Sequence, residues 1–407
     1  MPYRVLYLHH VGPFGGASRS MLEMIRHFPP GTVNPCVVTQ RGQYSEMLQK
    51  EGIPVIATAG IAQFDHSRYS YYRGIRWIVM LRELTYIPFT ILAMLKAKRR
   101  WPDVDVVHAN EITLIGSIVL ARWLFKKPVV VHVRSVQCNV DSRRTKWLTA
   151  LISRFADRVI AIDQNVRNSL SATLDAHVIH NGFTNPNQLL VPYHESSANM
   201  AFPNGKRKFT VGMVGTISRV KGCVEFVQAA AVCKERGLDI RFVFVGTSAR
   251  PSSGIQQAIL RFLDLSQEIE PTIQALIRQH RLSEMVEFRP FSTDLETVYT
   301  ALDVVCFPSH YDAPGRPIFE AAFFSVPSIA AITQPLDDTI INGRTGITIA
   351  PKSAAQLAAA VEYLYQHPRE RGEMGNAART LAMRNFDITS TANRVLALYR
   401  DVVPIER

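Results

Sequence analysis

The sequence is poor in cysteine, with five residues among 407. They are Cys36, Cys138, Cys223, Cys233 and Cys306. Because their number is odd and no two form a CxxC pair, the pattern argues against a disulfide scaffold and a thiolate metal site. The simplest interpretation is small buried residues in a reducing compartment, so we expect a cytoplasmic location.

Long apolar runs are also lacking. No stretch offers about twenty apolar residues free of charge, which is the length that a membrane-spanning helix needs. The first apolar run, within MPYRVLYLHHVGPFGG, is too short for a signal peptide. We therefore expect neither a spanning helix nor a secretory leader. The content of 47% hydrophobic residues is sufficient for globular folding. Because 407 residues exceed the usual size of a domain with a single hydrophobic core, the chain is expected to form two domains.

Acidic residues are fewer than basic ones: the chain has 34 Asp and Glu and 46 Lys and Arg, which gives a net charge of +12. Residues 1–200 hold 23 basic and 13 acidic side chains, whereas residues 201–407 hold 23 and 21. This uneven distribution indicates an anionic partner for the N-terminal half. No nucleic-acid partner is expected, because the sequence lacks stacking or groove-reading motifs.

The basic charge is densest in residues 65–101, where eight Lys and Arg against two acids interleave with aromatic and long apolar side chains. One hypothesis is that this segment contacts an anionic membrane surface or a lipid-linked acceptor. The alternative is one or two core helices with solvated cationic ends. Because Arg82, Glu83 and Pro88 interrupt a clean amphipathic stripe, the sequence slightly favours the core helices.

Short apolar runs alternate with helical patterns along the chain. Strands are expected at 5–8, 35–39, 104–108, 128–133, 158–162, 209–214, 240–245, 286–288 and 303–307, with helices such as 18–28 and 146–155 between them. This alternation predicts an α/β fold with parallel sheets covered by helices on both faces. It occurs twice, around a polar stretch at 186–208 that is expected to be a linker. We expect two doubly wound domains facing across a cleft, with ligands at the carboxyl ends of the strands.

The loop after the first expected strand reads HHVGPFGGASRSML and opens a helix. Gly12, Gly15 and Gly16 let the backbone approach a ligand closely, and a helix N-terminus favours anions. The GxGxxG spacing is missing, so a nicotinamide dinucleotide site is only weakly supported. A tight turn between strand and helix is an equal alternative.

The second half opens with VGMVGTISRVKG, which has the same order of strand, glycine and helix. It adds Arg219 and Lys221. Two cations beside a glycine turn can neutralise a diphosphate without a metal. Solvated surface charges are the default alternative for such a pair.

The segment FPSHYDAPGRPIFEAAFFSVPSIA sets Asp312 and Glu320 eight residues apart. Pro317 is expected at the first helical position, which places Glu320 in the first turn. Acids there complement the helix dipole by about 0.3–1 kcal/mol, or a carboxylate can instead bind a ribose diol. Arg316 either contacts a phosphate or pairs with Asp312.

His132 and Arg134 alternate at the end of the strand expected at 128–133, so they are expected to point to the same side, toward the cleft. A buried core histidine is the alternative for His132. No His, Cys or Asp cluster has metal-ligand spacing, so no metal is expected.

Taken together in their order along the chain, the motifs described above and several further segments resemble a retaining glycosyltransferase of glycosyltransferase family 4. That family has the GT-B fold. The resemblance extends over nearly the whole chain and rests on GGASRSMLEM, DVVHAN, VVVHVRS, RVIAIDQNVRNSL, VIHNGF, VGMVGTISRVKG and FPSHYDAPGRPIFEAAFFSVPSIAA. It implies Rossmann-like domains at 1–185 and 209–385. It also implies that the segment 386–407 forms a C-terminal helix that returns to the N-terminal domain.

The resemblance implies roles for the two acids and the two cations. The family's two-glutamate signature falls on Asp312, which is one methylene shorter, and on Glu320. Glu320 is then expected to bind the ribose, and Asp312 the hydroxyls of the donor sugar. Lys221 is similar to the family's diphosphate-binding lysine. The family's arginine usually follows the glycine, where this chain has Thr216, and Arg219 is expected to replace it.

The same resemblance adds loop and strand-end residues to the site. Gly15 and Gly16 match the loop that faces donor phosphate and acceptor. The position near the reacting sugar that is often histidine is Arg134 here, with His132 sharing the role. The nucleotide-sugar site is further expected to include Gly215, Thr216, Gly315 and Arg316.

The implied reaction moves a sugar from a nucleoside-diphosphate sugar to a glycan or lipid-linked acceptor, with retention of anomeric configuration. It needs neither a metal nor a cofactor. The expected location is the cytoplasm, including the inner face of the membrane. The alternatives are a sugar-nucleotide hydrolase, epimerase or phosphorylase of the same fold, and a non-catalytic sugar-nucleotide-binding module.

Overall fold

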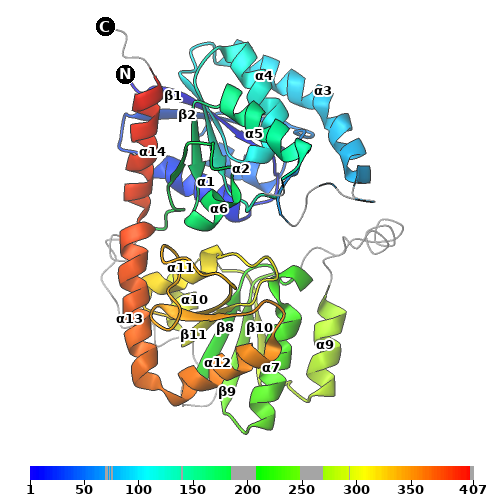
Figure 1. The fold of residues 1–407 in the computed structure, drawn as a ribbon, viewed down its shortest axis with the longest axis vertical. Helices are drawn as coiled ribbons and strands as arrows, with labels where there is room; N and C mark the ends of the chain where they lie inside the picture. Colours follow the sequence, from blue (N-terminus) through cyan, green and yellow to red (C-terminus); the bar gives the residue numbers. More distant parts are fainter. Residues whose placement is uncertain are drawn as a thin grey trace. The chain divides into compact units, whose positions relative to one another are not determined.

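A computed structural model describes residues 1–68, 72, 74, 77–138, 141–184, 208–247, 269–292 and 294–403. The chain forms two compact units (Figure 1). Unit 1 comprises Met1–Thr184 with Phe386–Arg407, and unit 2 comprises Asn185–Asn385. The expected linker at 186–208 lies outside the described residues, apart from Lys208.

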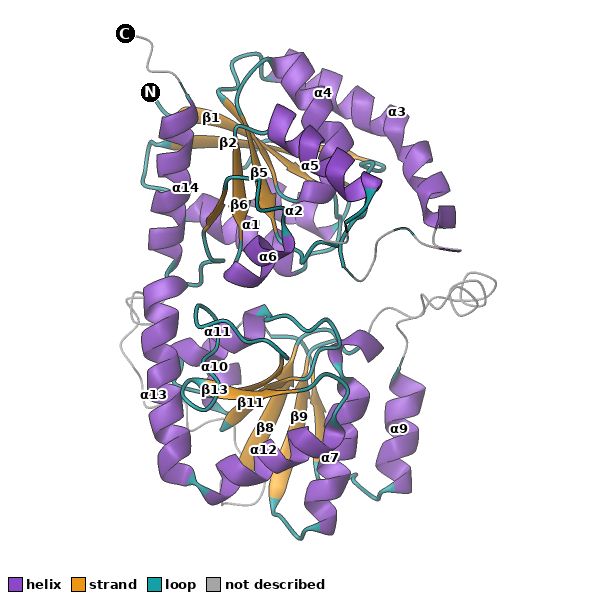
Figure 2. Ribbon diagram, in the orientation of Figure 1, coloured by secondary structure: helices purple, strands orange, loops and turns teal. Residues whose placement is uncertain are grey.

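Unit 1 is built on a seven-stranded parallel sheet with the order β3-β2-β1-β4-β5-β6-β7 (Figure 2). The strands are β1 Tyr3–His9, β2 Val33–Gln40, β3 Val55–Thr58, β4 Val106–Ala109, β5 Val129–Val133, β6 Arg158–Ala161 and β7 Ala176–Val178. Because the chain winds outward from β1 in both directions, the carboxyl ends of β1 and β4 meet at the point where the strand order reverses.

Helices cover both faces of this sheet. They are α1 Gly16–Arg26, α2 Gln43–Lys50, α3 Trp77–Arg100, η2 Ile112–Leu114, α4 Ile115–Phe125, α5 Arg143–Phe155, α6 Gln164–Ser169 and α14 Ile388–Val402. Successive residues of β1 alternate between the two layers: Val5 and Tyr7 pack with α1, α2 and α14, whereas Leu6 and Leu8 pack with α3 and α4. This two-sided burial explains why the strands are apolar throughout.

The last helix, α14, belongs to unit 1 although it comes from the far end of the chain. Its apolar side chains, among them Ile388 and Val395, join the core around α1 and α2. Its Tyr399 hydroxyl lies 3.1 Å from the Tyr7 hydroxyl on β1. The predicted return of the C-terminal helix to the N-terminal domain is therefore confirmed.

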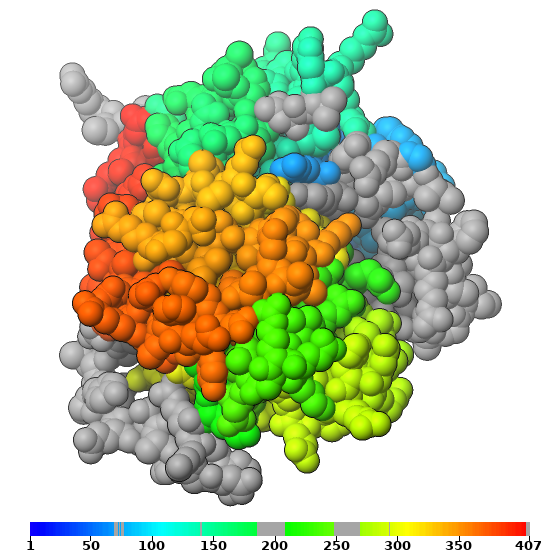
Figure 3. Space-filling view, turned by 60° about the horizontal axis from the view of Figure 1, so that its bottom comes forward, coloured from blue at the N-terminus to red at the C-terminus, as the bar shows by residue number. Residues whose placement is uncertain are grey.

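Unit 2 repeats the architecture with a six-stranded parallel sheet of order β10-β9-β8-β11-β12-β13. The strands are β8 Phe209–Val214, β9 Ile240–Val245, β10 Val286–Arg289, β11 Val304–Phe307, β12 Ser328–Ala331 and β13 Gly346–Ile349. The helices are η5 Arg219–Lys221, α7 Cys223–Glu235, α9 Glu270–Gln279, α10 Leu295–Thr300, α11 Arg316–Phe323, α12 Ala354–Gln366 and α13 Pro368–Asn385. Figure 3 shows the surface where α7 and α12 lie side by side. The expected doubly wound fold class is confirmed for both units.

The segment around α3 differs from the favoured expectation. α3 is one helix of 24 residues, which the favoured alternative of one or two core helices allows, but only five of its residues are buried, so it is not a core helix. It is the one helix of the described chain that is long and apolar enough to cross a membrane, by length and composition only. The acid that was expected to break its apolar stripe, Glu83, faces inward and is buried.

Candidate active site

In unit 2, the loop after β8 carries the predicted cations. Gly215 and Thr216 are exposed at the strand end, and the chain then turns through η5, whose first and last residues are Arg219 and Lys221. Gly222 follows in the left-handed conformation, with φ at +81°. A Cβ on Gly222 would overlap the carbonyl oxygen of Pro308, so only glycine allows this loop to approach the loop after β11.

Lys221 is half-buried, whereas Arg219 is exposed. The Lys221 Nζ atom lies 5.1 Å from the ring centroid of Phe307 and 5.8 Å from that of Tyr311. Within the described part of the chain, no carboxylate forms an ion pair with it, and burial lowers its pKa. Lys221 is therefore a desolvated cation held against two aromatic faces, with its charge available to an anion.

The loop after β11 is tied to the loop after β8. The backbone N–H of His310 donates to the carbonyl of Val220 over 2.9 Å. The ring of His310 lies 2.9 Å from the Glu225 carboxylate, in the first turn of α7. These contacts fix the distance between the two loops. As a result, Lys221 and the start of α11 both lie against the Phe307 ring.

Gly315 caps the N-terminus of α11 and packs on Phe307 so closely that a Cβ there would overlap the ring. The helix begins at Arg316, so Pro317 is the second helical residue rather than the first. As a consequence, Glu320 lies in the second turn, and its predicted place in the first turn is wrong. The helix dipole at this end of α11 still favours an anion near Gly315.

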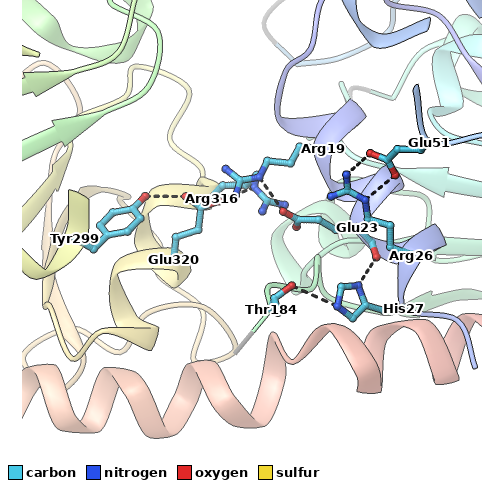
Figure 4. A network of polar contacts seen from close by, with 9 residues as sticks. All are labelled: Arg19, Glu23, Arg26, His27, Glu51, Thr184, Tyr299, Arg316 and Glu320. Carbon is cyan, nitrogen blue, oxygen red and sulfur yellow. Dashed lines mark hydrogen bonds and ion pairs between the residues drawn. The ribbon is translucent and has the colours of Figure 1, made fainter. Parts of the chain in front are cut away.

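Glu320 is only 3% exposed. One carboxylate oxygen accepts from the Tyr299 hydroxyl over 2.7 Å, and the other accepts from the Arg316 guanidinium over 2.9 Å (Figure 4). Arg316 thus pairs with Glu320 one turn away, and the predicted alternative of an Arg316–Asp312 pair is wrong. A buried carboxylate needs such partners, and here they orient it rigidly.

Asp312 is bound to a different part of unit 2. Its carboxylate accepts from the backbone N–H and the hydroxyl of Thr333, over 2.7 and 2.6 Å. Its φ of +47° is left-handed, a conformation that aspartate tolerates better than most residues. The structure therefore brings Lys221 and Gly315 together on the Phe307 ring, while Asp312 fastens the loop to the segment after β12.

In unit 1, Gly15 caps α1 and Gly16 is its first residue. Both are exposed, and the first turn of α1 contains no acid. Ser18 faces inward, and its hydroxyl lies 2.9 Å from Nε2 of His9 at the end of β1. The predicted glycine loop is thus a helix N-terminus anchored to the strand that precedes it.

A polar cluster gathers at the carboxyl ends of β1, β4 and β5. The Arg134 guanidinium donates to Asn110 over 2.8 Å and to Asn181 over 2.6 Å, and it lies 3.3 Å from Nδ1 of His132. The contact with His132 confirms that these two side chains share one side of the sheet. Asn110 in turn donates to Nδ1 of His9 over 2.9 Å.

Burial, followed by the charge of Arg134, holds the pKa of His132 well below its usual value and lowers that of His108 to about 3. His132 is 1% exposed. Among the described residues, the Nε2 atoms of both imidazoles have no hydrogen-bond partner. His132 therefore stays neutral and supports Arg134, which carries the positive charge at this strand end.

Glu111, which follows β4, is a buried acid at this strand end that was not among the predicted site residues. Its buried carboxylate accepts from the backbone N–H of Ile112 over 2.9 Å and from the Ser135 hydroxyl over 3.2 Å. Burial raises its pKa to about 7. The signal in the sequence was its place directly after DVVHAN, at a strand end beside Asn110.

A small pocket of about 40 Å³ lies beside this edge of unit 1. One side of it is apolar, with Phe64, Ile112 and Leu148, and polar groups such as Gln137 and Thr145 complete it.

Two family models match the chain. Residues 14–184 match Glycosyltransferase Family 4, and residues 196–381 match Glycosyl transferases group 1. The two models together span most of the sequence, one for each unit.

The similar curated proteins are glycosyltransferases. D-inositol 3-phosphate glycosyltransferase of Arthrobacter sp. (strain FB24) is 30% identical over 210 residues, which are 51% of this chain and 46% of that protein. Glycogen synthase of Mycobacterium tuberculosis is 22% identical over 97% of this chain and 89% of its own length. CapM of Staphylococcus aureus, a capsular polysaccharide biosynthesis glycosyltransferase, is 22% identical over 87% and 91%. The chain spans about half the length of the inositol phosphate enzymes that it matches.

Solved structures share the fold. Alr3699/HepE of Anabaena, crystallised with UDP and glucose, has a TM-score of 0.73 and 20% identity, covering 97% of this chain and 99% of that one. Sucrose-phosphate synthase of Thermosynechococcus elongatus has a TM-score of 0.69 and 17% identity, covering 98% of each chain. With family models on both units and the same two-sheet fold in these neighbours, the protein belongs to the group 1 glycosyltransferases, with a family 4 N-terminal domain and the GT-B fold.

Proposed function

We propose that this enzyme transfers a hexose from a nucleoside-diphosphate sugar to a glycan or lipid-linked acceptor, with retention of anomeric configuration. The observation that carries the proposal is Lys221, a desolvated cation beside the N-terminus of α11 that has no carboxylate partner in the described chain. Such a group is suited to the diphosphate of the donor.

In this proposal, the donor binds to unit 2. Lys221 and the exposed Arg219 contact the diphosphate, with the backbone of Gly215, Thr216 and Gly315 alongside. Glu320, oriented by Tyr299 and Arg316, binds the ribose hydroxyls. The complexes of Alr3699/HepE with UDP and with UDP-glucose support a uridine nucleotide as the first choice of donor.

Cleavage of the bond between sugar and phosphate leaves growing negative charge on the diphosphate and an oxocarbenium-like sugar. Fixed cations and helix N–H groups aimed at that charge stabilise the transition state more than the ground state. Two cations in this position make a bound metal unnecessary for charge neutralisation. We propose front-side attack by the acceptor hydroxyl, with the departing phosphate accepting its proton.

Unit 1 supplies the acceptor side in this scheme. Arg134, held by Asn110 and Asn181, provides a fixed positive charge at the carboxyl ends of β4 and β5. His132 positions that guanidinium. The N-terminus of α1 at Gly15 and Gly16 adds exposed N–H groups. A cytoplasmic location, including the inner face of the membrane, is part of the same proposal.

The test is a panel of UDP-, GDP- and dTDP-sugars, scored first by thermal stabilisation and then by sugar transfer to lipid extracts and glycan primers. We expect one nucleotide class to stabilise the protein, EDTA to leave turnover unchanged, and NMR to show an α-product from an α-donor. Donor turnover that is insensitive to every acceptor would instead indicate a hydrolase or epimerase. An inverted product would contradict retention.

One observation favours the alternative of a non-catalytic sugar-nucleotide-binding module. All four carboxylate oxygens of Asp312 and Glu320 already have partners, which are Thr333 for the first and Tyr299 with Arg316 for the second. A wild-type protein that binds the nucleotide sugar but never turns it over would support this alternative. Turnover that is lost in Lys221→Ala and Glu320→Ala would support the enzyme.

A further inference from the structure

The outward face of α3 presents a series of large apolar side chains from Trp77 to Leu95. Large exposed side chains on this helix include Trp77, Leu81, Leu84, Leu92 and Leu95, and Leu81 and Leu92 are 62% and 63% exposed. With Pro88, which is also exposed, these residues follow one another at spacings of three or four, so they form one stripe of a helix. We call these six residues the α3 stripe.

The opposite face of α3 is firmly attached to unit 1. Ala93, Met94 and Ala97 belong to the core that packs on the sheet. The Thr90 hydroxyl accepts from the N–H of Ala62 over 2.8 Å, and the Glu83 carboxylate accepts from the N–H of Gln63 over 3.1 Å. A transmembrane orientation would break these contacts, so α3 lies on the surface of the folded unit with its stripe directed outward.

The exposed charged residues of α3 are all basic. The described helix carries Arg82, Lys96, Lys98, Arg99 and Arg100, and its single acid, Glu83, is buried and paired with Arg82. Four of the five cations fall in the last two turns, directly after the stripe. An apolar stripe that ends in cations, with no exposed acid, is typical of helices that lie in the interface of an anionic bilayer.

Neighbouring helices extend the same surface, since α4 packs against α3 and α5 against α4 (Figure 1). Trp123 on α4 is 79% exposed, and Trp147 on α5 is 52% exposed. The Trp147 ring is linked to that of Trp77 through contacts with Phe64 and Tyr72. Exposed tryptophans are costly in water but are favoured at the boundary between lipid and water.

We infer that α3 docks the enzyme in the plane of an anionic membrane, with the α3 stripe inserted among the acyl chains and its C-terminal cations on the phosphates. A second copy of the chain fits less well than an anionic surface, because both faces would carry exposed cations and no exposed acid from α3. The inference goes beyond the proposed reaction and is tested without any sugar.

The experiment is co-sedimentation of the full chain with vesicles of phosphatidylglycerol and phosphatidylcholine, against pure phosphatidylcholine, at low and high salt. We expect binding to the anionic vesicles that weakens with salt. The variant Leu81→Gln/Leu84→Gln/Leu92→Gln should lower the partition coefficient at least about tenfold. Met383→Gln, which changes an exposed apolar residue of unit 2, is the matched control and should bind like the wild type.

The charge contribution is tested with Lys96→Gln/Arg99→Gln, because both side chains are exposed. Lys98 and Arg100 are left in place, since they also lie on the rings of Phe125 and Trp101. The double variant should bind anionic vesicles more weakly and with a smaller salt dependence, whereas Lys96→Arg/Arg99→Lys should restore both.

The depth to which α3 inserts into the bilayer is tested by quenching of tryptophan fluorescence, with lipids that are brominated at shallow or deep acyl positions. We expect shallow quenching that is reduced in Trp77→Phe. Three results would overturn the inference: no binding to anionic vesicles at low salt, equal binding by the triple glutamine variant, and a dimer in light scattering that the triple variant abolishes while vesicle binding is absent. Circular dichroism and thermal melts confirm that each variant folds.

Discussion

Replacing Lys221 by methionine removes one half-buried cation from unit 2 and keeps much of the side-chain volume. In the free protein the ammonium contacts the rings of Phe307 and Tyr311, and no acid in the described chain pairs with it. The loss of the charge should therefore leave folding intact. A charge-assisted contact with the donor diphosphate contributes about 1.5–3 kcal/mol, so Lys221→Met should raise Kd for the nucleotide about 10- to 150-fold.

The effect on catalysis should exceed the effect on binding, because the charge on the departing diphosphate grows in the transition state. Removal of one such electrostatic contact lowers kcat by roughly 10²- to 10³-fold. Calorimetry gives Kd, and initial rates give kcat. The control is Lys208→Met, which removes an exposed pair with Asp239 in the same unit and should change neither. Equal affinity and equal kcat in Lys221→Met would refute this assignment.

The lowered pKa of Lys221 adds a dependence on pH. Between this lowered pKa and the ordinary lysine value of about 10.4, the unfolded chain holds a proton that the folded chain has released. Folding stability therefore rises with pH across that window in the wild type but not in Lys221→Met. The affinity for the diphosphate changes with pH in the opposite direction. Binding needs the protonated ammonium of Lys221, so the affinity should fall as pH rises through the lowered pKa.

Two further predictions concern local structure. Gly222→Ala should lower the Tm of unit 2 by roughly 4–8 °C, because its left-handed φ and the overlap with Pro308 cost about 2 kcal/mol or more. Gly237→Ala, equally left-handed but with open space around the Cβ, should cost about half of that. For Glu111, the pKa of about 7 exceeds its unfolded value, so the folded chain binds the extra proton and loses stability as pH rises through 7. Urea unfolding at pH 5 and pH 8 should show a loss of up to about 3 kcal/mol that Glu111→Gln does not show.

The sheets were predictable from the sequence because buried parallel strands are apolar on both faces, as Val5 to Leu8 illustrate. The same rule fails for α3, whose apolar outward stripe has the composition of a core helix. The contacts of the folded helix, such as those of Glu83 and Thr90, distinguish the inner face from the outer one. Composition measures how apolar a helix is and carries no information on what covers it.

Within the site, the glycine loops and Lys221 were predictable because their spacing along the chain is local. The partners of the carboxylates were not, because they depend on contacts between distant segments. Asp312 binds Thr333, which follows the next strand, and Glu320 binds Tyr299, which precedes β11. Glu111 was missed for the same reason, since its burial depends on the loop that carries Ser135.

Unit 1 is formed by two segments that are far apart in the sequence, and this affects the order in which the units fold during synthesis. Because β1 is synthesised before α14, Tyr7 and His108 can contact the Tyr399 hydroxyl only after α14 has been made. Unit 2 is continuous in sequence and can complete its core earlier. Unit 1 therefore completes its core only after α14 has been made, and until then the part of its sheet that α14 covers stays exposed.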